Sequence, residues 1–251
     1  QDKKIKRIYN VNSIFILIFK WRQDFINLGY EDAEIKNNFL SLIHEEDIVW
    51  KSYLNMICLY LKCFEGIPIN KFKNSLEIGS GQGGGPYLLR KYFNVLETVG
   101  IDANRLHVLI SNIKFKKDNV TYKRFNSDNF VQLNRKFDFV YSIEASTHFN
   151  DVNNFFVNVC KCLNKEGYFL YVDIFDVQNV NKIEDCITKK FIIQSKFDLT
   201  DGVLKSIENN IQQESKKSII TRIMSWFQKS DGMELDIGSE LYSKKKKKKI
   251  L

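Results

Sequence analysis

The sequence predicts an α/β fold built on a mostly parallel, doubly wound sheet. Short apolar runs alternate with amphipathic stretches of about ten residues through the middle of the chain. A glycine cluster follows the first apolar run, as expected where a buried strand turns into a helix. Alternating strands and helices form βαβ units, and right-handed crossovers then place the helices on both faces of the sheet.

The apolar runs predict six strands, and the amphipathic stretches predict the helices that connect and cover them. The predicted strands are residues 75–78, 98–101, 120–125, 137–143, 168–174 and 191–197. The predicted helices are residues 39–64, 86–93, 104–114, 152–163, 182–190 and 203–228. Residues 238–251 carry no pattern that indicates a regular element.

Four segments differ in their patterning. Residues 1–70 are predicted to form a helical N-terminal cap, 71–200 the core, 201–243 a helical C-terminal cap, and 244–251 a lysine-rich tail. Six consecutive lysines in that tail supply most of the net charge of +8, so we expect no nucleic-acid surface on the body of the protein. The lysine run has three interpretations: a solvated tail, a translated poly-A stretch, or a membrane or nucleic-acid anchor.

Length and composition limit the class of protein. The chain has 251 residues, 44% of them hydrophobic, which suits one full-sized domain. Five cysteines without a C-x-x-C pair and three scattered histidines predict reduced thiols in a cytoplasmic protein and no metal site.

The apolar run at residues 14–19 is far shorter than the ~20 residues of a membrane span. The first residue is Gln1, so we expect a fragment or a processed form.

A glycine-rich loop at residues 77–86 is the first candidate for a ligand site. Ligands of open parallel sheets bind at the carboxyl ends of strands, where the strand order reverses. Glycines leave no Cβ to obstruct a ligand. Asp102 ends the next predicted strand, 21 residues after Gly81, where an acid can accept both hydroxyls of a cofactor ribose. The alternatives are a tight turn without a ligand and a helix-capping role for Asp102.

These residues resemble motif I and the ribose-binding acid of the class I S-adenosylmethionine (SAM)-dependent methyltransferases, which have a Rossmann-like fold. The resemblance implies SAM as the cofactor. Asn126 stands where the family often has an acid beside the adenine, and Glu144 is expected at the methionine end of SAM or as a loop acceptor. The implied cofactor-binding residues are Glu77, Gly79, Ser80, Gly81, Gly83, Asp102, Ala103, Asn126, Ser127, Asp128 and Glu144.

The region after the fourth predicted strand is similar to a small-molecule subgroup, the phthiotriol dimycocerosates and sugar O-methyltransferases. The similarity rests on G-S-G-x-G-G-G at residues 79–85 and on Glu144, His148, Gly167 and Asp173. It implies methylation of a hydroxyl on a lipid-like molecule or secondary metabolite, with His148 as base and Asp173 as its orienting or substrate-binding partner. The alternative for His148 is packing or capping of the next helix.

Several alternatives stay open at this point. N- or C-methylation would use the same fold. A non-catalytic nucleotide-binding module with a Rossmann-like fold is a further alternative. An NAD-dependent oxidoreductase is disfavoured because the spacing is not G-x-G-x-x-G. The helices at residues 39–64 and 203–228 are expected to cover a hydrophobic acceptor pocket. Members of the family end in an antiparallel strand pair, so we expect the last strand to be missing and the sheet edge to be exposed.

Overall fold

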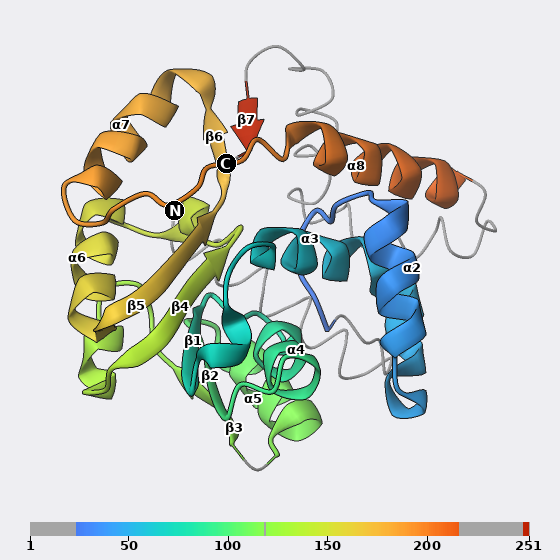
Figure 1. The fold of residues 1–251 in the computed structure, drawn as a ribbon, viewed down its shortest axis with the longest axis horizontal. Helices are drawn as coiled ribbons and strands as arrows, with labels where there is room; N and C mark the ends of the chain where they lie inside the picture. Colours follow the sequence, from blue (N-terminus) through green and yellow to red (C-terminus); the bar gives the residue numbers. More distant parts are fainter. Residues whose placement is uncertain (1–23, 118, 216–247, 251) are drawn as a thin grey trace.

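The computed structural model describes residues 24–117, 119–215 and 248–250. Its centre is a parallel five-stranded sheet in the order β3-β2-β1-β4-β5 (Figure 1). The strands are β1 (Asn74–Ile78), β2 (Glu97–Asp102), β3 (Val120–Arg124), β4 (Phe137–Ile143) and β5 (Leu163–Val172). The strand order reverses between β1 and β4, so the loops that follow these two strands open at the switch point, where ligands of doubly wound sheets bind.

Helices cover both faces of this sheet, as the alternation predicted. One face packs against α3 (Leu54–Phe64), α4 (Gly84–Tyr92) and α5 (Arg105–Phe115), and the other against α6 (Val152–Cys162) and α7 (Val177–Thr188). Successive side chains of a strand point to opposite faces of the sheet, so each strand contributes to two separate cores. Phe139 and Tyr141 belong to the first core, whereas Val140 between them belongs to the second.

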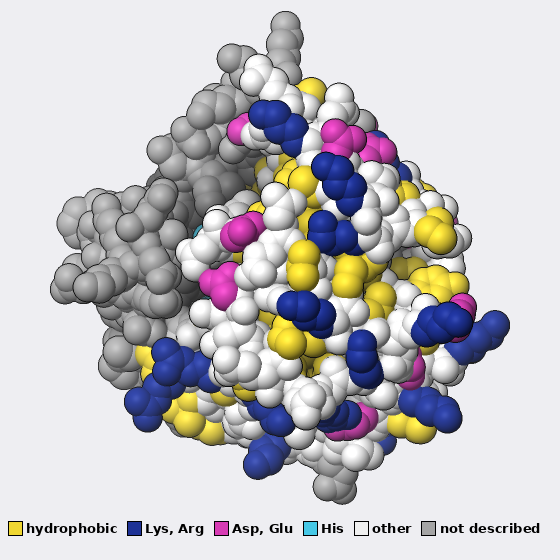
Figure 2. Space-filling view, turned by 90° about the vertical axis from the view of Figure 1, so that its left-hand side faces the viewer, with side chains coloured by type: hydrophobic (Ala, Val, Ile, Leu, Met, Phe, Trp, Pro, Cys, Tyr) yellow, Lys and Arg dark blue, Asp and Glu magenta, His cyan; other side chains and the backbone are white. Residues whose placement is uncertain are grey.

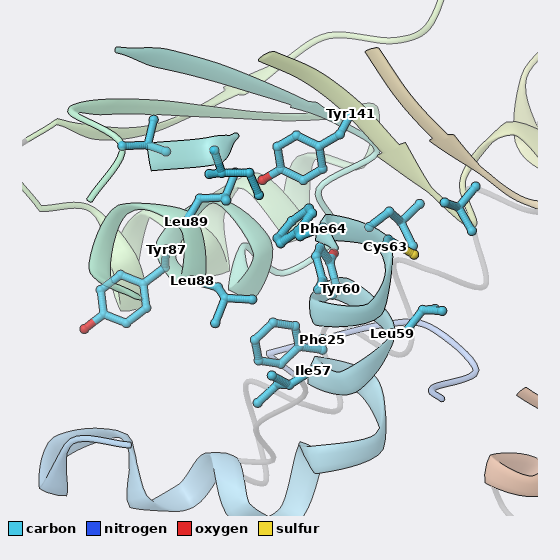
Figure 3. Close-up of a cluster of buried hydrophobic side chains, with 14 of the residues drawn as sticks. Phe25, Ile57, Leu59, Tyr60, Cys63, Phe64, Tyr87, Leu88, Leu89 and Tyr141 are labelled. Carbon is cyan, nitrogen blue, oxygen red and sulfur yellow. The ribbon is translucent and has the colours of Figure 1, made fainter. Parts of the chain in front are cut away.

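The N-terminal region is joined to the core by a shared aromatic cluster. Residues 24–32 run in an irregular strap before α2 (Ala33–Leu42), a 3-10 helix η1 (Glu45–Tyr53) and α3. The predicted helical stretch at 39–64 is therefore interrupted by 3-10 geometry. Phe25 of the strap and Tyr60 and Phe64 of α3 meet Leu89 of α4 and Tyr141 of β4 (Figure 3). The cap and the sheet thus share one core, which fixes the strap beside the switch point.

The predicted strand at residues 191–197 is wrong. This segment is irregular, and Ile192 is 86% exposed. A groove lined by Phe169 and Tyr171 of β5 and by Ile193 and Phe197 separates it from the sheet edge. A strand needs a backbone ladder, and residues 191–197 contribute no strand to the sheet, although the Phe191 ring packs on Phe169 of β5 at 5.1 Å between centroids. Figure 2 shows the side of the molecule that carries α6 and α7, where apolar side chains are exposed among Lys and Arg side chains.

The C-terminal part also departs from prediction. The helix expected at 182–190 is α7, which begins at Val177, and the helix expected at 203–228 is α8 (Thr200–Ser215), with the remainder outside the described residues. Residues 248–250 form a strand, β7, which pairs antiparallel with β6 (Ile174–Asp176). The lysine-rich tail therefore ends in an element that its composition did not predict. Within the described ranges, no helix is both long and apolar enough to span a bilayer.

Candidate functional site at the switch point

The loop after β1 makes a turn that requires glycine. Gly79, Gly81 and Gly83 have φ of 81°, 52° and 94°, values that residues with a Cβ seldom adopt. A Cβ on Gly79 would lie 2.4 Å from the Cβ of Ala145, so the loop after β4 also packs on this glycine. The N–H groups of Gly79 and Ser80 both donate to the carbonyl of Ile101 at 2.9 Å, which fastens the loop to the end of β2.

Asp102 lies against this loop. The Gly81 N–H donates to Asp102 Oδ2 at 2.9 Å, and the Asn104 N–H donates to Oδ1 at 2.8 Å. The imidazole Nδ1 of His107 lies 3.4 Å from Oδ1. The N-cap of α5 is Asn104, whose side chain accepts from the Leu106 N–H at 2.9 Å. The capping alternative for Asp102 is therefore wrong.

The glycine loop and Asp102 share one cavity at the carboxyl ends of β1, β2 and β4. Its walls contain most of the residues that the sequence proposed. The predicted residues that line it are Gly79, Ser80, Gly81, Asp102, Ala103, Asn126, Ser127, Glu144 and His148. Glu77, Gly83, Asp128 and Asp173 are absent from the lining.

Glu77 supports the loop from below. Its carboxylate accepts from the Tyr60 hydroxyl at 2.7 Å and from the Tyr141 hydroxyl at 3.4 Å. A Cβ on Gly85 would lie 2.3 Å from Glu77 Oε2, so the helix start needs glycine above this carboxyl group. Burial raises the pKa of Glu77 to about 8, although its tyrosine hydrogen bonds act to lower it.

Gly83 and Asp128 do not line the cavity themselves and bind residues beside it. The carbonyl of Gly83 accepts from the Tyr122 hydroxyl at 2.7 Å, and a Cβ there would lie 2.8 Å from the Tyr122 ring. Asp128 Oδ2 accepts from the Asn150 side chain at 3.0 Å. Asn126 Oδ1 accepts from the Asp128 N–H at 3.0 Å, so Asn126 shapes the turn whose residues line the cavity.

Glu144 presents a buried acceptor to the cavity. Its φ is 51°, a strained value for a residue with a side chain, and strain of this kind gathers at functional sites. Oε2 accepts from the Leu28 N–H of the strap at 2.8 Å. Oε1 is buried and has no hydrogen-bond partner among the described residues. Burial raises the pKa of Glu144 to about 8, with a smaller contribution from the charge of Asp173.

His148 lines the cavity, and Asp173 lies behind its wall. His148 ends a 3-10 turn, η4 (Ser146–His148), after β4. Desolvation lowers its pKa, while the charges of Asp173 and Asp102 act to raise it. Asp173 is 1% exposed and accepts from the N–H groups of Ser146 at 2.6 Å and Ile174 at 2.8 Å. Asp173 thus acts on His148 through its charge.

Sequence patterns did not identify the strap as part of the site. Asp24, Phe25 and Ile26 line the cavity, although they lie about fifty residues before the glycine loop. The carbonyl of Asp24 accepts from the Gly84 N–H at 3.0 Å, and its carboxylate accepts from Trp50 Nε1 at 2.9 Å. No local motif marks these residues. The other residues of the lining that the sequence did not propose include Tyr60, His107, Phe125, Phe149 and Asn150.

The family model described as a methyltransferase domain matches residues 55–191. This match covers more than half of the chain. The chain belongs to this methyltransferase family. The matched region contains the glycine loop, Asp102, Glu144 and His148, but it excludes the strap at residues 24–32.

Relatives and solved structures agree with this assignment. The phthiotriol/phenolphthiotriol dimycocerosates methyltransferase of Mycobacterium tuberculosis is 24% identical over 163 residues, which cover 64% of this chain and 60% of that protein. The fatty-acid O-methyltransferase of Mycolicibacterium smegmatis is 23% identical over 163 residues, 62% of this chain and 59% of that protein. The matched part of the chain thus spans about three fifths of the length of these curated relatives.

Two solved structures confirm the fold as that of Rossmann-like methyltransferases. A putative sarcosine dimethylglycine methyltransferase from Galdieria sulphuraria has a TM-score of 0.67 at 14% identity, covering 96% of each chain. The O-methyltransferase of a Brevibacillus brevis multienzyme, solved with S-adenosylhomocysteine, has a TM-score of 0.63 at 13% identity, covering 91% of this chain and 82% of that one.

The steric role of the loop can be tested with two glycines of similar conformation. Gly79 and Gly66 have φ of +81° and +77°, but only Gly66 has open space where a Cβ would lie. We expect Gly66→Ala to lower the free energy of unfolding by about 1–2 kcal/mol through backbone strain alone. Gly79→Ala should cost about 1–3 kcal/mol more because its methyl group meets Ala145. Urea unfolding measures both, and equal losses would contradict the packing described.

The buried carboxyl group of Glu77 predicts a pH dependence of stability. The folded protein keeps the Glu77 proton up to about pH 8, whereas the unfolded chain releases it near the ordinary pKa of 4.5. Unfolding therefore releases a proton from Glu77 in this window, and this group makes the free energy of unfolding fall as pH rises, by at most about 1.4 kcal/mol per pH unit. We expect Glu77→Gln to flatten this fall in urea titrations between pH 5 and 8. The exposed control Glu166→Gln should retain the wild-type slope, and a wild-type slope in Glu77→Gln would refute the prediction.

Proposed function

We propose that this protein is a SAM-dependent methyltransferase that methylates a hydroxyl group of a lipid-like molecule or secondary metabolite, with His148 as the base. The observation that carries the proposal is the hydrogen bond between the Gly81 N–H and the Asp102 carboxylate within one cavity. This hydrogen bond holds the glycine loop beside a carboxylate that can accept hydrogen bonds from ribose hydroxyls, and both lie at the switch point of the sheet.

Three features of the cavity suit SAM. The glycine loop leaves room for a nucleoside against the backbone, and Asp102 offers its carboxylate to ribose hydroxyls. Ala103, Asn126 and Ser127 form the wall beside these groups and would hold the adenine end. Glu144 Oε1 is a buried oxygen that lacks a partner among the described residues, and the cationic methionine end would bind there and favour the ionised form of this carboxyl group. When bound, SAM supplies an electrophilic methyl group on a positively charged sulfur.

The chemical class of the acceptor is inferred from relatives. Two curated relatives are named for methylating a fatty acid and phthiotriol dimycocerosates, and the Brevibacillus brevis structure is an O-methyltransferase. These names favour an oxygen acceptor on a lipid-like molecule. The apolar side chains of Phe25, Ile26 and Phe149 in the cavity wall are compatible with such an acceptor.

The residues of the cavity divide the work of the reaction. His148 has a pKa lowered by desolvation, so its imidazole is neutral at neutral pH and a ring nitrogen can take the proton of the acceptor hydroxyl. The charge of Asp173 behind it stabilises the imidazolium that results. Phe25, Ile26 and Phe149 exclude water, and the cavity walls hold the acceptor in line with the methyl group.

The cofactor assignment predicts a selective loss of SAM binding. Asp102→Asn removes the charge that ribose hydroxyls would meet, so we expect calorimetry to show SAM affinity reduced by about 10- to 100-fold. The matched control is Asp128→Asn, because Asp128 does not line the cavity and its carboxylate accepts from the Asn150 side chain. It should change affinity less than about threefold. Tight NAD binding without SAM binding would overturn the assignment in favour of a dinucleotide-binding module.

The role of His148 predicts a loss of rate without a loss of SAM affinity. We expect His148→Ala to lower kcat for an alcohol acceptor by about 10²- to 10⁴-fold, since general-base catalysis contributes that much. Transfer of label from methyl-labelled SAM into a lipid and metabolite extract identifies the acceptor and measures the rate. His44→Ala, an exposed histidine outside the cavity lining, is the control. Label transfer that persists unchanged in His148→Ala would remove this residue from the mechanism. Label found on a nitrogen or carbon atom of the acceptor would show N- or C-methylation in place of O-methylation.

A further inference from the structure

Three side chains behind the cavity wall form a continuous hydrogen-bond chain. The Tyr171 hydroxyl on β5 lies 2.5 Å from Ser146 Oγ, and Ser146 Oγ lies 2.5 Å from Asp173 Oδ2. Ser146 is 5% exposed and Asp173 is 1% exposed. Neither Ser146 nor Tyr171 lines the cofactor cavity, so the proposed mechanism leaves both without a role.

The chemistry of these groups sets the direction of the chain. An ionised carboxylate only accepts hydrogen bonds, and a serine hydroxyl has a single hydrogen to donate. Ser146 must therefore donate its hydroxyl hydrogen to Asp173, and its oxygen must accept from Tyr171. Hydrogen bonds in such a chain polarise one another, so the Tyr171 donation strengthens the bond that Ser146 makes to Asp173.

The chain ends on a carboxylate that burial would otherwise neutralise. Desolvation raises the pKa of Asp173, and the hydrogen bonds from Ser146 and the N–H of Ile174 lower it. The charge of His148 also lowers the pKa of Asp173, and the charge of Asp173 in turn raises the pKa of the nearby Glu144. The donors thus favour the ionised form of Asp173 in an environment that opposes it.

The ionised form of Asp173 matters for His148. The charges of Asp173 and Asp102 raise the pKa of His148 against desolvation. Asp102 is already engaged by the N–H groups of Gly81 and Asn104 at the glycine loop. Of the two carboxyl groups that act on His148, Asp173 is therefore the one that accepts a hydrogen bond from the Ser146 hydroxyl.

We propose that Ser146 and Tyr171 are positioning residues that keep the Asp173 carboxylate ionised and fixed behind His148, and so set the basicity of the proposed base. The inference rests on the proposed function, in which His148 removes the acceptor proton. Among the described residues, the hydrogen-bond path from Tyr171 to Asp173 runs through Ser146.

The test removes single hydroxyl groups and follows His148 directly. Tyr171→Phe keeps the ring that packs on Phe156 at 5.1 Å between centroids, so the core is retained. Tyr168→Phe is the matched control, because Tyr168 lies on the same strand and its ring contacts Phe72, far along the strand from Ser146. The chain has three histidines, so an NMR titration of the full chain resolves the His148 signal, which His148→Ala identifies.

The expected results follow from the direction of the chain. The pKa of His148 should fall in Tyr171→Phe, fall further in Ser146→Ala, and stay at the wild-type value in Tyr168→Phe. The double variant Ser146→Ala/Tyr171→Phe should match Ser146→Ala alone, because the hydrogen-bond path from Tyr171 to Asp173 among the described residues runs through Ser146. With SAM and acceptor, the acid limb of the pH profile of kcat should move to lower pH and the plateau should fall about 3- to 10-fold, as for a weaker base.

Two outcomes separate this inference from the proposed function. An unchanged His148 titration in Tyr171→Phe and Ser146→Ala, or an equal shift in Tyr168→Phe, would overturn the positioning role even where His148→Ala is inactive. Activity that survives in His148→Ala would overturn the proposed base, while a shifted His148 titration would still support the effect of the chain on Asp173. If Ser146→Ala does not fold, Tyr171→Phe alone decides the matter.

Discussion

The close approach of the loop after β1 to its neighbours is the constraint on which the rest of this structure depends. Glycines at residues 79, 81 and 83 let the backbone contact Ala145 on one side and Ser111 and Tyr122 on the other, and they turn a loop N–H toward Asp102. A Cβ at Gly79 or Gly83 would lie closer than van der Waals contact to these neighbours, so the loop and the neighbouring elements would have to move apart. The cavity exists because the loop occupies so little space.

Buried carboxyl groups surround this loop, and each has a different partner. Glu77 binds two tyrosine hydroxyls beneath the loop, Glu144 binds the strap, and Asp173 binds Ser146. Glu144 alone of these three keeps a buried oxygen without a partner among the described residues. A carboxyl group therefore supports the loop in one place, lines the cavity in a second and binds a serine outside the cavity lining in a third.

The strap connects the cavity to the outer helices. It bonds Gly84 of the loop through the Asp24 carbonyl and Glu144 through the Leu28 N–H. Its Leu28 carbonyl accepts from Ser206 of α8 at 2.9 Å. A segment remote in sequence thus ties the cavity to the C-terminal helix α8 through one short stretch of backbone.

Local chemistry in the sequence determined the parallel sheet, the glycine turn and the position of Asp102, because alternation of apolar residues and the need for φ above zero are properties of neighbouring residues. Tertiary structure decided which acids line the cavity: Asp102 and Glu144 do, whereas Asp128 binds Asn150 and Asp173 binds Ser146. It also decided that residues 191–197 form no strand, because a ladder requires an adjacent edge and a groove separates them from β5. Orientation and pairing of this kind depend on contacts between segments far apart in the chain, which no local pattern records.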